Sequence, residues 1–164
     1  MTKRVVIVLA ATLVASASTF VLTGFASATS AMAHAGDSVA VAVYEGRTPC
    51  GPIANEFTRF PSEGCEKIKW QLTFFRDAQT RQPSAFLYEG TRGARRGTWT
   101  IHRGTPFDAA AQVYRLTPTP EGKPLSLLNV DDKALLLLDE SLRVLAGDAS
   151  WSYVLNRTDR KLSK

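Results

Sequence analysis

The segment from residue 125 to residue 157 constrains the fold of this chain more than any other feature. It consists of short apolar runs separated by Asp-Asp, Asp-Glu-Ser and Gly-Asp. Runs of this length are too short for helices and are typical of consecutive antiparallel strands joined by tight turns. The last run places Trp151, Tyr153 and Leu155 on one face of a strand. We therefore predict a β-meander that closes with a buried aromatic face.

The preceding residues extend this pattern. Strands are predicted over residues 38–44, 67–74, 84–88, 98–102 and 112–116. Apolar and polar residues alternate most clearly over 67–74, whereas the strand at 38–44 has two fairly apolar faces. Trp99 and Ile101 share the apolar side of one of them. Between the strands we expect a loop with one helical turn near residues 54–57 and a Gly-rich basic turn over residues 90–97. Eight to nine strands in succession predict an all-β fold, a small closed antiparallel meander barrel of lipocalin-like form, with a β-sandwich as the alternative.

The first 35 residues have the pattern of a secretory signal peptide. Lys3 and Arg4 precede an apolar run over residues 5–22, and Ala-x-Ala sites follow it. Cleavage is expected after Ala35, with Ala28 and Ala33 as alternatives, and an uncleaved N-terminal anchor is the competing interpretation. We expect one domain over residues 36–164, located in the periplasm. No cysteine follows the apolar run closely, so a lipoprotein tether is not expected. Cleavage is expected to leave no stable membrane anchor.

The charge and the cysteine content limit the possible partners. Without Lys3 and Arg4, the 20 basic residues fall to 18 against 15 acidic ones, a net charge of +3. This small excess does not indicate a nucleic-acid partner. The two cysteines, Cys50 and Cys65, are expected to form a disulfide in an exported chain, with two buried thiols as the alternative.

Several short motifs resemble one family. The segment YEGRTPC at residues 44–50 resembles the Y-x-G-x-x-P-C opening of the NlpE-like envelope lipoproteins, a copper-resistance and surface-sensing family. The segments LYEGT at 87–91 and GTW at 97–99 are similar to it, as is the closing pattern between residues 131 and 157. The resemblance implies a small lipocalin-like barrel exposed to the periplasm. The chain departs from the family in lacking the lipobox and the C-x-x-C motif, because Ile53 replaces the second cysteine.

Neither metal chemistry nor catalysis is strongly indicated. A copper site requires Cys, Met or His ligands at coordinating distance. The expected mature chain offers only Cys50, Cys65 and His102, and a disulfide would remove two of these three. General acid–base catalysis needs a titrating group near a partner, and His102 is the only near-neutral candidate. We expect no cofactor and no enzymatic activity.

Two groups of side chains are candidates for contact with a ligand or a partner. The arginines Arg92, Arg95 and Arg96 could meet acidic groups, although an ordinary solvated turn is the simpler interpretation. Trp99 and the other aromatic residues could line a cavity, or could form the core. The sequence therefore predicts a periplasmic barrel of the envelope-stress type that binds an envelope protein or a small apolar ligand. The alternatives are a copper-handling protein using Cys50, Cys65 and His102, and a barrel that carries a lipid-like ligand.

Overall fold

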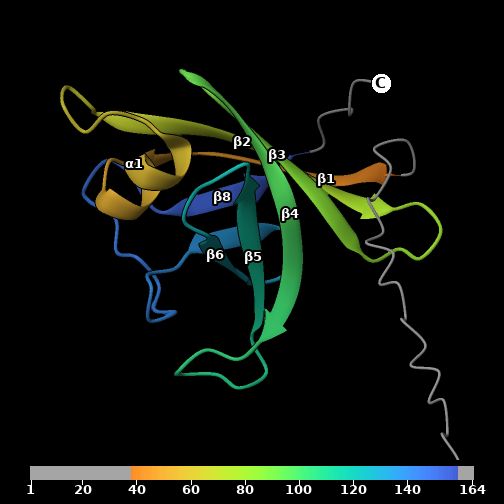
Figure 1. Ribbon diagram of the computed structural model, residues 1–164. Coiled ribbons are helices and arrows are strands. Elements are labelled where there is room, and N and C mark those ends of the chain that lie inside the picture. Colours follow the sequence, from red (N-terminus) through yellow and green to blue (C-terminus); the bar gives the residue numbers. More distant parts are fainter. Residues whose placement is uncertain (1–37, 159–164) are drawn as a thin grey trace, which may run out of the picture. The chain divides into compact units, whose positions relative to one another are not determined.

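The computed structural model describes residues 38–158, which form a closed antiparallel β-barrel with one short helix (Figure 1). Each strand pairs with the next along the chain, and the last strand pairs with the first. The predicted closed meander is confirmed. The elements are β1 (Ser38–Pro49), α1 (Pro52–Thr58), β2 (Lys67–Asp77), β3 (Pro83–Gly90), β4 (Gly93–Arg103), β5 (Gln112–Thr119), β6 (Leu125–Asn129), β7 (Ala134–Leu137) and β8 (Val154–Arg157).

Closure depends on the first strand. β1 pairs along its whole length with β2 and, near its middle, pairs Tyr44 with Arg157 of β8. At Gly46 a Cβ atom would lie 2.7 Å from the carbonyl oxygen of Val154, so only glycine lets β8 approach β1 this closely. The register of β1 and β2 shifts between Ala40 and Ala42, and such bulges increase the bending of a strand. These local features allow the meander to close into a barrel.

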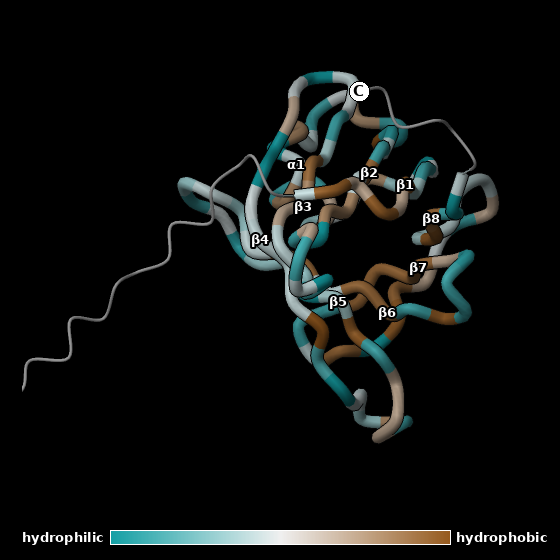
Figure 2. The backbone as a smooth tube through the Cα atoms, turned by 90° about the vertical axis from the view of Figure 1, so that its right-hand side faces the viewer, coloured by the Kyte–Doolittle hydropathy of each residue, from teal (hydrophilic) through white to brown (hydrophobic). Residues whose placement is uncertain are grey.

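The barrel interior is filled by apolar side chains from every strand. Inward and outward positions alternate along β2, where the even-numbered residues from 68 to 74 are buried. The fully buried leucines are Leu72, Leu116, Leu125, Leu127, Leu135, Leu137, Leu138 and Leu155. The apolar stretches of β6 and β7 appear brown in Figure 2. Burial of each such side chain contributes about 1.5–3 kcal/mol to stability, so this interior is the main stabilising feature.

The two ends of the barrel differ. At the end where β1 leads into β2, the helix α1 begins with Pro52, an unstrained position for proline, and contributes Ala54 and Phe57 to the core. We call this the helix end, and we call the opposite end, where β2 leads into β3 and β4 into β5, the mouth. Within residues 38–158, no helix is long and apolar enough to cross a membrane.

Two sequence expectations are wrong in detail. β8 begins at Val154 rather than at residue 151, because the Asp148 carboxylate accepts backbone hydrogen bonds from Ser150 and Trp151 and holds them in a turn. Trp151 is therefore only half-buried. The basic turn is limited to residues 91 and 92, since β4 already begins at Gly93. Ile101 shares one side of β4 with Trp99, as expected, and is 39% exposed. The predicted signal peptide lies outside the described residues.

Candidate functional site

The helix end is closed by an aromatic cluster and by a covalent link. Phe57 of α1 stacks on Trp70, with ring centroids 5.8 Å apart, and also packs against Phe86 and Tyr88. Cys50 and Cys65 form a disulfide on either side of the helix segment, with a sequence separation of 15 residues, as predicted. This end of the barrel is therefore packed and held in place by α1.

Arg95 reinforces this closure from inside the barrel. It was predicted to lie in a surface turn, but its position in β4 directs it inward, and it is 8% exposed. Its guanidinium donates hydrogen bonds to the Phe57 carbonyl oxygen, at 2.6 Å, and to the Glu121 carbonyl oxygen. Burial lowers the pKa of Arg95, and the nearby Arg59 lowers it further. Its contacts tie α1 to the loop after β5, so it stabilises the helix end.

The mouth contains a second aromatic cluster. Phe74 lies at its centre, with ring centroids 4.8 Å from Trp99, 5.6 Å from Tyr114 and 5.7 Å from Tyr44, all close to edge-on. Edge-to-face pairs of this kind add to the stability gained from burial. Trp99, predicted to contact a ligand or to belong to the core, is 3% exposed and packs in this cluster. No helix covers this end within the described part of the chain.

Polar groups hold the aromatic residues of the mouth in position. The Trp99 indole donates to the Phe75 carbonyl oxygen at 2.7 Å, and the Tyr44 hydroxyl donates to the Asp132 carbonyl oxygen at 3.0 Å. Burial raises the pKa of Tyr44 to about 12, with a further contribution from Tyr114 and a smaller opposing effect of Arg157. Burial also raises the pKa of Tyr114. The hydroxyls of Tyr44 and Tyr114 therefore stay protonated at neutral pH.

A small pocket opens above this cluster. Its volume is about 170 Å³, and the aromatic residues form its floor. Arg76 from β2 and Arg157 from β8 line it together with Asp132 from the turn after β6. The Arg76 guanidinium carbon lies 5.2 Å from the centroid of the Trp99 ring, a cation–π contact. The mouth pocket therefore combines a floor of aromatic residues, packed edge-on to one another, with two positively charged side chains, an arrangement suited to binding.

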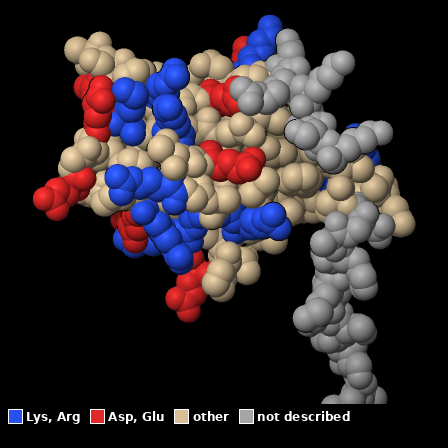
Figure 3. Space-filling model, turned by 90° about the horizontal axis from the view of Figure 1, so that it is seen from above, with Lys and Arg blue, Asp and Glu red and all other residues tan. Residues whose placement is uncertain are grey.

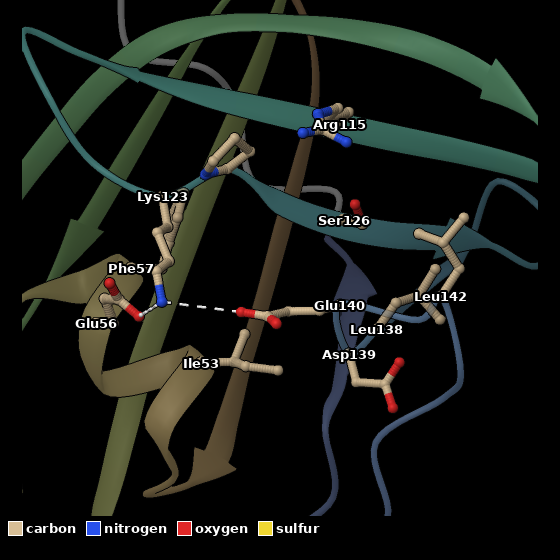
Figure 4. A pocket seen from close by; sticks show the side chains of 11 residues that line it. Ile53, Glu56, Phe57, Arg115, Lys123, Ser126, Leu138, Asp139, Glu140 and Leu142 are labelled. Carbon is tan, nitrogen blue, oxygen red and sulfur yellow. Dashed lines mark ion pairs between the residues drawn. The ribbon is translucent and has the colours of Figure 1, made fainter.

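A second hollow, of about 240 Å³, lies beside α1 (Figure 4). Ile53 of α1 and Leu138 and Leu142 of the β7–β8 loop give it an apolar lining. Lys123 reaches across it to Glu56, at 3.2 Å, and to Glu140, at 3.8 Å. Lys123 is therefore paired with both glutamates. Exposed ion pairs of this kind contribute little to stability. The charged lining of this cleft is of mixed sign, with Arg115 and Lys123 beside Glu56, Asp139 and Glu140.

The other predicted contact residues are dispersed. Arg92 lies in the β3–β4 turn, where its guanidinium is 5.2 Å from the Phe60 ring centroid. Arg96 is exposed on the outer side of β4, opposite to the direction of Arg95. The three arginines therefore do not form a single surface cluster. Lysines and arginines do gather on the face shown in Figure 3, with acidic residues beside them, as expected of a solvated surface.

The three residues predicted as an alternative copper site do not come together. Cys50 and Cys65 bond to each other and lie at the helix end, whereas His102 is exposed near the mouth end of β4. The His102 imidazole is 2.9 Å from the Thr100 hydroxyl. Within residues 38–158, no three side chains of His, Cys, Asp or Glu form a cluster that could hold a metal ion. The disulfide leaves neither cysteine as a thiolate ligand.

Comparisons with protein-family models, with curated proteins and with solved structures find no match for this chain. The candidate site therefore depends on its geometry alone. Sequence reasoning identified Trp99 but missed Tyr44, Arg76, Tyr114 and Arg157. A signal existed for Tyr114, because it alternates with Leu116 on one face of a predicted strand. Arg76 and Arg157 are 81 positions apart and gave no such signal (157 less 76).

Proposed function

We propose that this protein is an exported binding protein of the cell envelope that takes a small ligand in the mouth of its barrel. The pocket above the aromatic cluster carries this proposal, since it lies at the end of the barrel that α1 does not cover. Binding sites in small barrels are commonly at the mouth, with an apolar lining and a few polar groups that fix orientation. The pocket has both components.

The size of the pocket limits the ligand. Sites for drug-sized molecules have volumes of roughly 300–1,000 Å³, whereas the mouth pocket measures about 170 Å³. A long acyl chain would need an empty barrel interior, but Leu72, Leu116 and Leu135 fill the space below the floor. The proposed ligand is accordingly a small molecule with one or two rings, and not the lipid-like ligand considered from the sequence.

The location in the envelope is supported by independent features. The N-terminal segment has the charged start, apolar run and Ala-x-Ala sites of a signal peptide. A disulfide such as Cys50–Cys65 persists mainly in oxidising compartments such as the periplasm. The motifs that resemble NlpE-like proteins agree with this location and with a role in sensing envelope conditions. The copper-handling alternative receives no support, because its two thiols are joined.

The binding proposal is tested by titrating isotopically labelled protein with benzoate, benzyl alcohol and benzylamine, three one-ring probes of different charge. The chain has three indole N–H groups that NMR can follow. The resonance of Trp99 should shift, because this side chain lies at the pocket floor. That of Trp70 should not, since its indole donates to Thr48 at the helix end. If no probe moves the Trp99 resonance, the mouth is not a binding site.

Export requires a separate test. The full-length chain is expressed in a Gram-negative host, and the periplasmic fraction is analysed by intact mass spectrometry. We expect a chain that begins directly after Ala28, Ala33 or Ala35, with the mass two hydrogens lower than that of the reduced form. Recovery of an uncleaved chain in the membrane fraction would contradict the proposal.

A further inference from the structure

Two guanidinium groups at the mouth have no acidic partner among residues 38–158. None of the ion pairs within residues 38–158 includes Arg76 or Arg157. Arg76 donates one hydrogen bond, to the Arg81 carbonyl oxygen at 2.8 Å, and Arg157 donates one, to the Val41 carbonyl oxygen at 3.3 Å. A guanidinium has five N–H donors. Most of the donors of both side chains therefore remain available in the pocket.

Barrel closure is what brings these two arginines to one pocket. β1 pairs with β2 on one side and with β8 on the other, so Arg76 and Arg157 approach from the two strands that flank β1. Asp132 is the one acidic residue among those lining the pocket, and its carboxylate accepts a hydrogen bond from Asn129. The lining thus has two positive charges and one negative charge, which favours an anionic ligand.

The floor of the mouth pocket places a second requirement on the ligand. The Tyr114 hydroxyl makes no hydrogen bond with any residue in the described part of the chain, although Tyr114 is 7% exposed. It is available as a donor next to the aromatic surface. Arg76 already lies over the Trp99 ring, so the cation–π position that a positively charged ligand would seek is occupied. A ligand cation would also be repelled by both guanidinium groups.

We infer that the mouth selects aromatic carboxylates with one or two rings, an inference that depends on the mouth being the binding site proposed above. The ring lies against Tyr114, the most exposed of the aromatic residues that line the pocket, and the carboxylate accepts charge-assisted hydrogen bonds from Arg76 and Arg157. Arginine is suited to this task because its planar fork matches the two oxygens of a carboxylate. Neither the ring nor the carboxylate of the ligand suffices alone in a pocket this open. A carboxylate without an aromatic ring should therefore bind poorly.

The probes named above test the inference when their dissociation constants are compared at pH 7. Hydrogen bonds to a charged group are roughly twice as strong as neutral ones. We therefore expect benzoate to bind at least about tenfold more tightly than benzyl alcohol, which has the same ring without the charge, and benzylamine to bind most weakly. Acetate, a carboxylate without a ring, should leave the Trp99 indole resonance unchanged at the same concentrations.

Substitutions of Arg76 and Arg157 test whether these two side chains cause the preference for benzoate over benzyl alcohol. Arg76→Gln combined with Arg157→Gln should reduce benzoate affinity to that of benzyl alcohol, while the exposed Arg96→Gln leaves the ratio unchanged. Arg157→Lys keeps the charge and should retain part of the preference. A urea midpoint equal to that of the wild type shows that the double variant is folded. If the double variant unfolds, the wild-type ratio and the effect of Arg157→Lys still test the inference.

The outcomes separate the two proposals. Equal affinities for benzoate and benzyl alcohol, both shifting Trp99, would overturn the anion selectivity and leave the mouth as a binding site. A preference for benzoate that survives in the double variant would also refute the roles of Arg76 and Arg157. Benzoate binding that shifts other resonances but not Trp99, or no binding by any probe, would refute both proposals.

Discussion

Trp99 and Trp151 provide a paired test of which aromatic side chains stabilise the barrel. The sequence predicts both to lie on inward faces, but the structure buries Trp99 and leaves Trp151 half-buried in the loop before β8. Replacement of each by alanine should therefore have unequal effects on the free energy of unfolding. The comparison is matched, since the same atoms are removed in both variants.

The expected magnitudes follow from the contacts. Trp99 packs edge-on against Phe74 and close to Tyr114, and it donates to the Phe75 carbonyl oxygen. Truncation of a buried tryptophan typically costs about 3–5 kcal/mol, so we expect about 4 kcal/mol for Trp99→Ala. Trp151 has one charged contact, with the Lys67 ammonium 5.0 Å from its ring centroid. An exposed cation–π contact contributes about 0.5–1 kcal/mol, and with partial burial the cost should be about 1–2 kcal/mol.

Urea denaturation followed by far-UV circular dichroism measures both variants, because this signal does not depend on the tryptophans alone. At an unchanged slope, the shift in the midpoint gives the change in the free energy of unfolding. Trp99→Ala should shift the midpoint at least twice as far as Trp151→Ala. Equal shifts, or a larger effect at Trp151, would show that the loop before β8 packs as the sequence pattern predicts, and would refute the structural reasoning.

Three further predictions concern the helix end and the buried tyrosines. Replacement of both cysteines by serine should reduce the free energy of unfolding by about 3 kcal/mol, the value expected for a 15-residue loop; an unchanged urea midpoint would contradict this. Arg95→Met leaves two carbonyl oxygens without their donor and should cost about 2 kcal/mol, whereas Arg96→Met on the outer face should change stability by less than about 0.5 kcal/mol. Tyr44 and Tyr88 should ionise near pH 12 in phenolate absorbance. Because the pKa of a tyrosine in the unfolded chain is about 10, stability should be retained below pH 10 and should fall as the pH rises toward 12; ionisation of all four tyrosines near pH 10 in the folded protein would argue against their burial.

Periodicity in the sequence predicts the strands well where one face is buried. The alternation from Lys67 to Phe74 was sufficient to place β2, and the short runs after residue 125 predicted β6 and β7. The same signal failed at Trp151, because the apolar pattern continues through residues that Asp148 holds in a turn. It also failed at Arg95. A positive charge in a Gly-rich segment indicates a solvated turn. The burial of Arg95 depends on carbonyl oxygens far away in the sequence, those of Phe57 in α1 and Glu121 in the loop after β5.

The candidate site could not be predicted from local patterns, because it depends on which strands meet. The pairing of β1 with both β2 and β8 is a property of closure, and no local feature of residues 76 or 157 indicates that they line one pocket. Because arginines are mostly exposed in folded proteins, an arginine near a strand end is ordinarily expected to face solvent and not to line a pocket.

Both ends of the barrel have an aromatic cluster, and each places an arginine over an aromatic ring. At the helix end, Arg95 lies over Phe57, and its guanidinium is satisfied by carbonyl oxygens of the chain itself. At the mouth, Arg76 lies over Trp99 and uses only one donor. At the helix end, α1 and the loop after β5 each supply a carbonyl acceptor to Arg95. Among residues 38–158, the mouth supplies a single carbonyl acceptor to Arg76, from Arg81. A buried or half-buried guanidinium is stabilised by acceptors, so the acceptors missing at the mouth are the ones that a carboxylate ligand would provide.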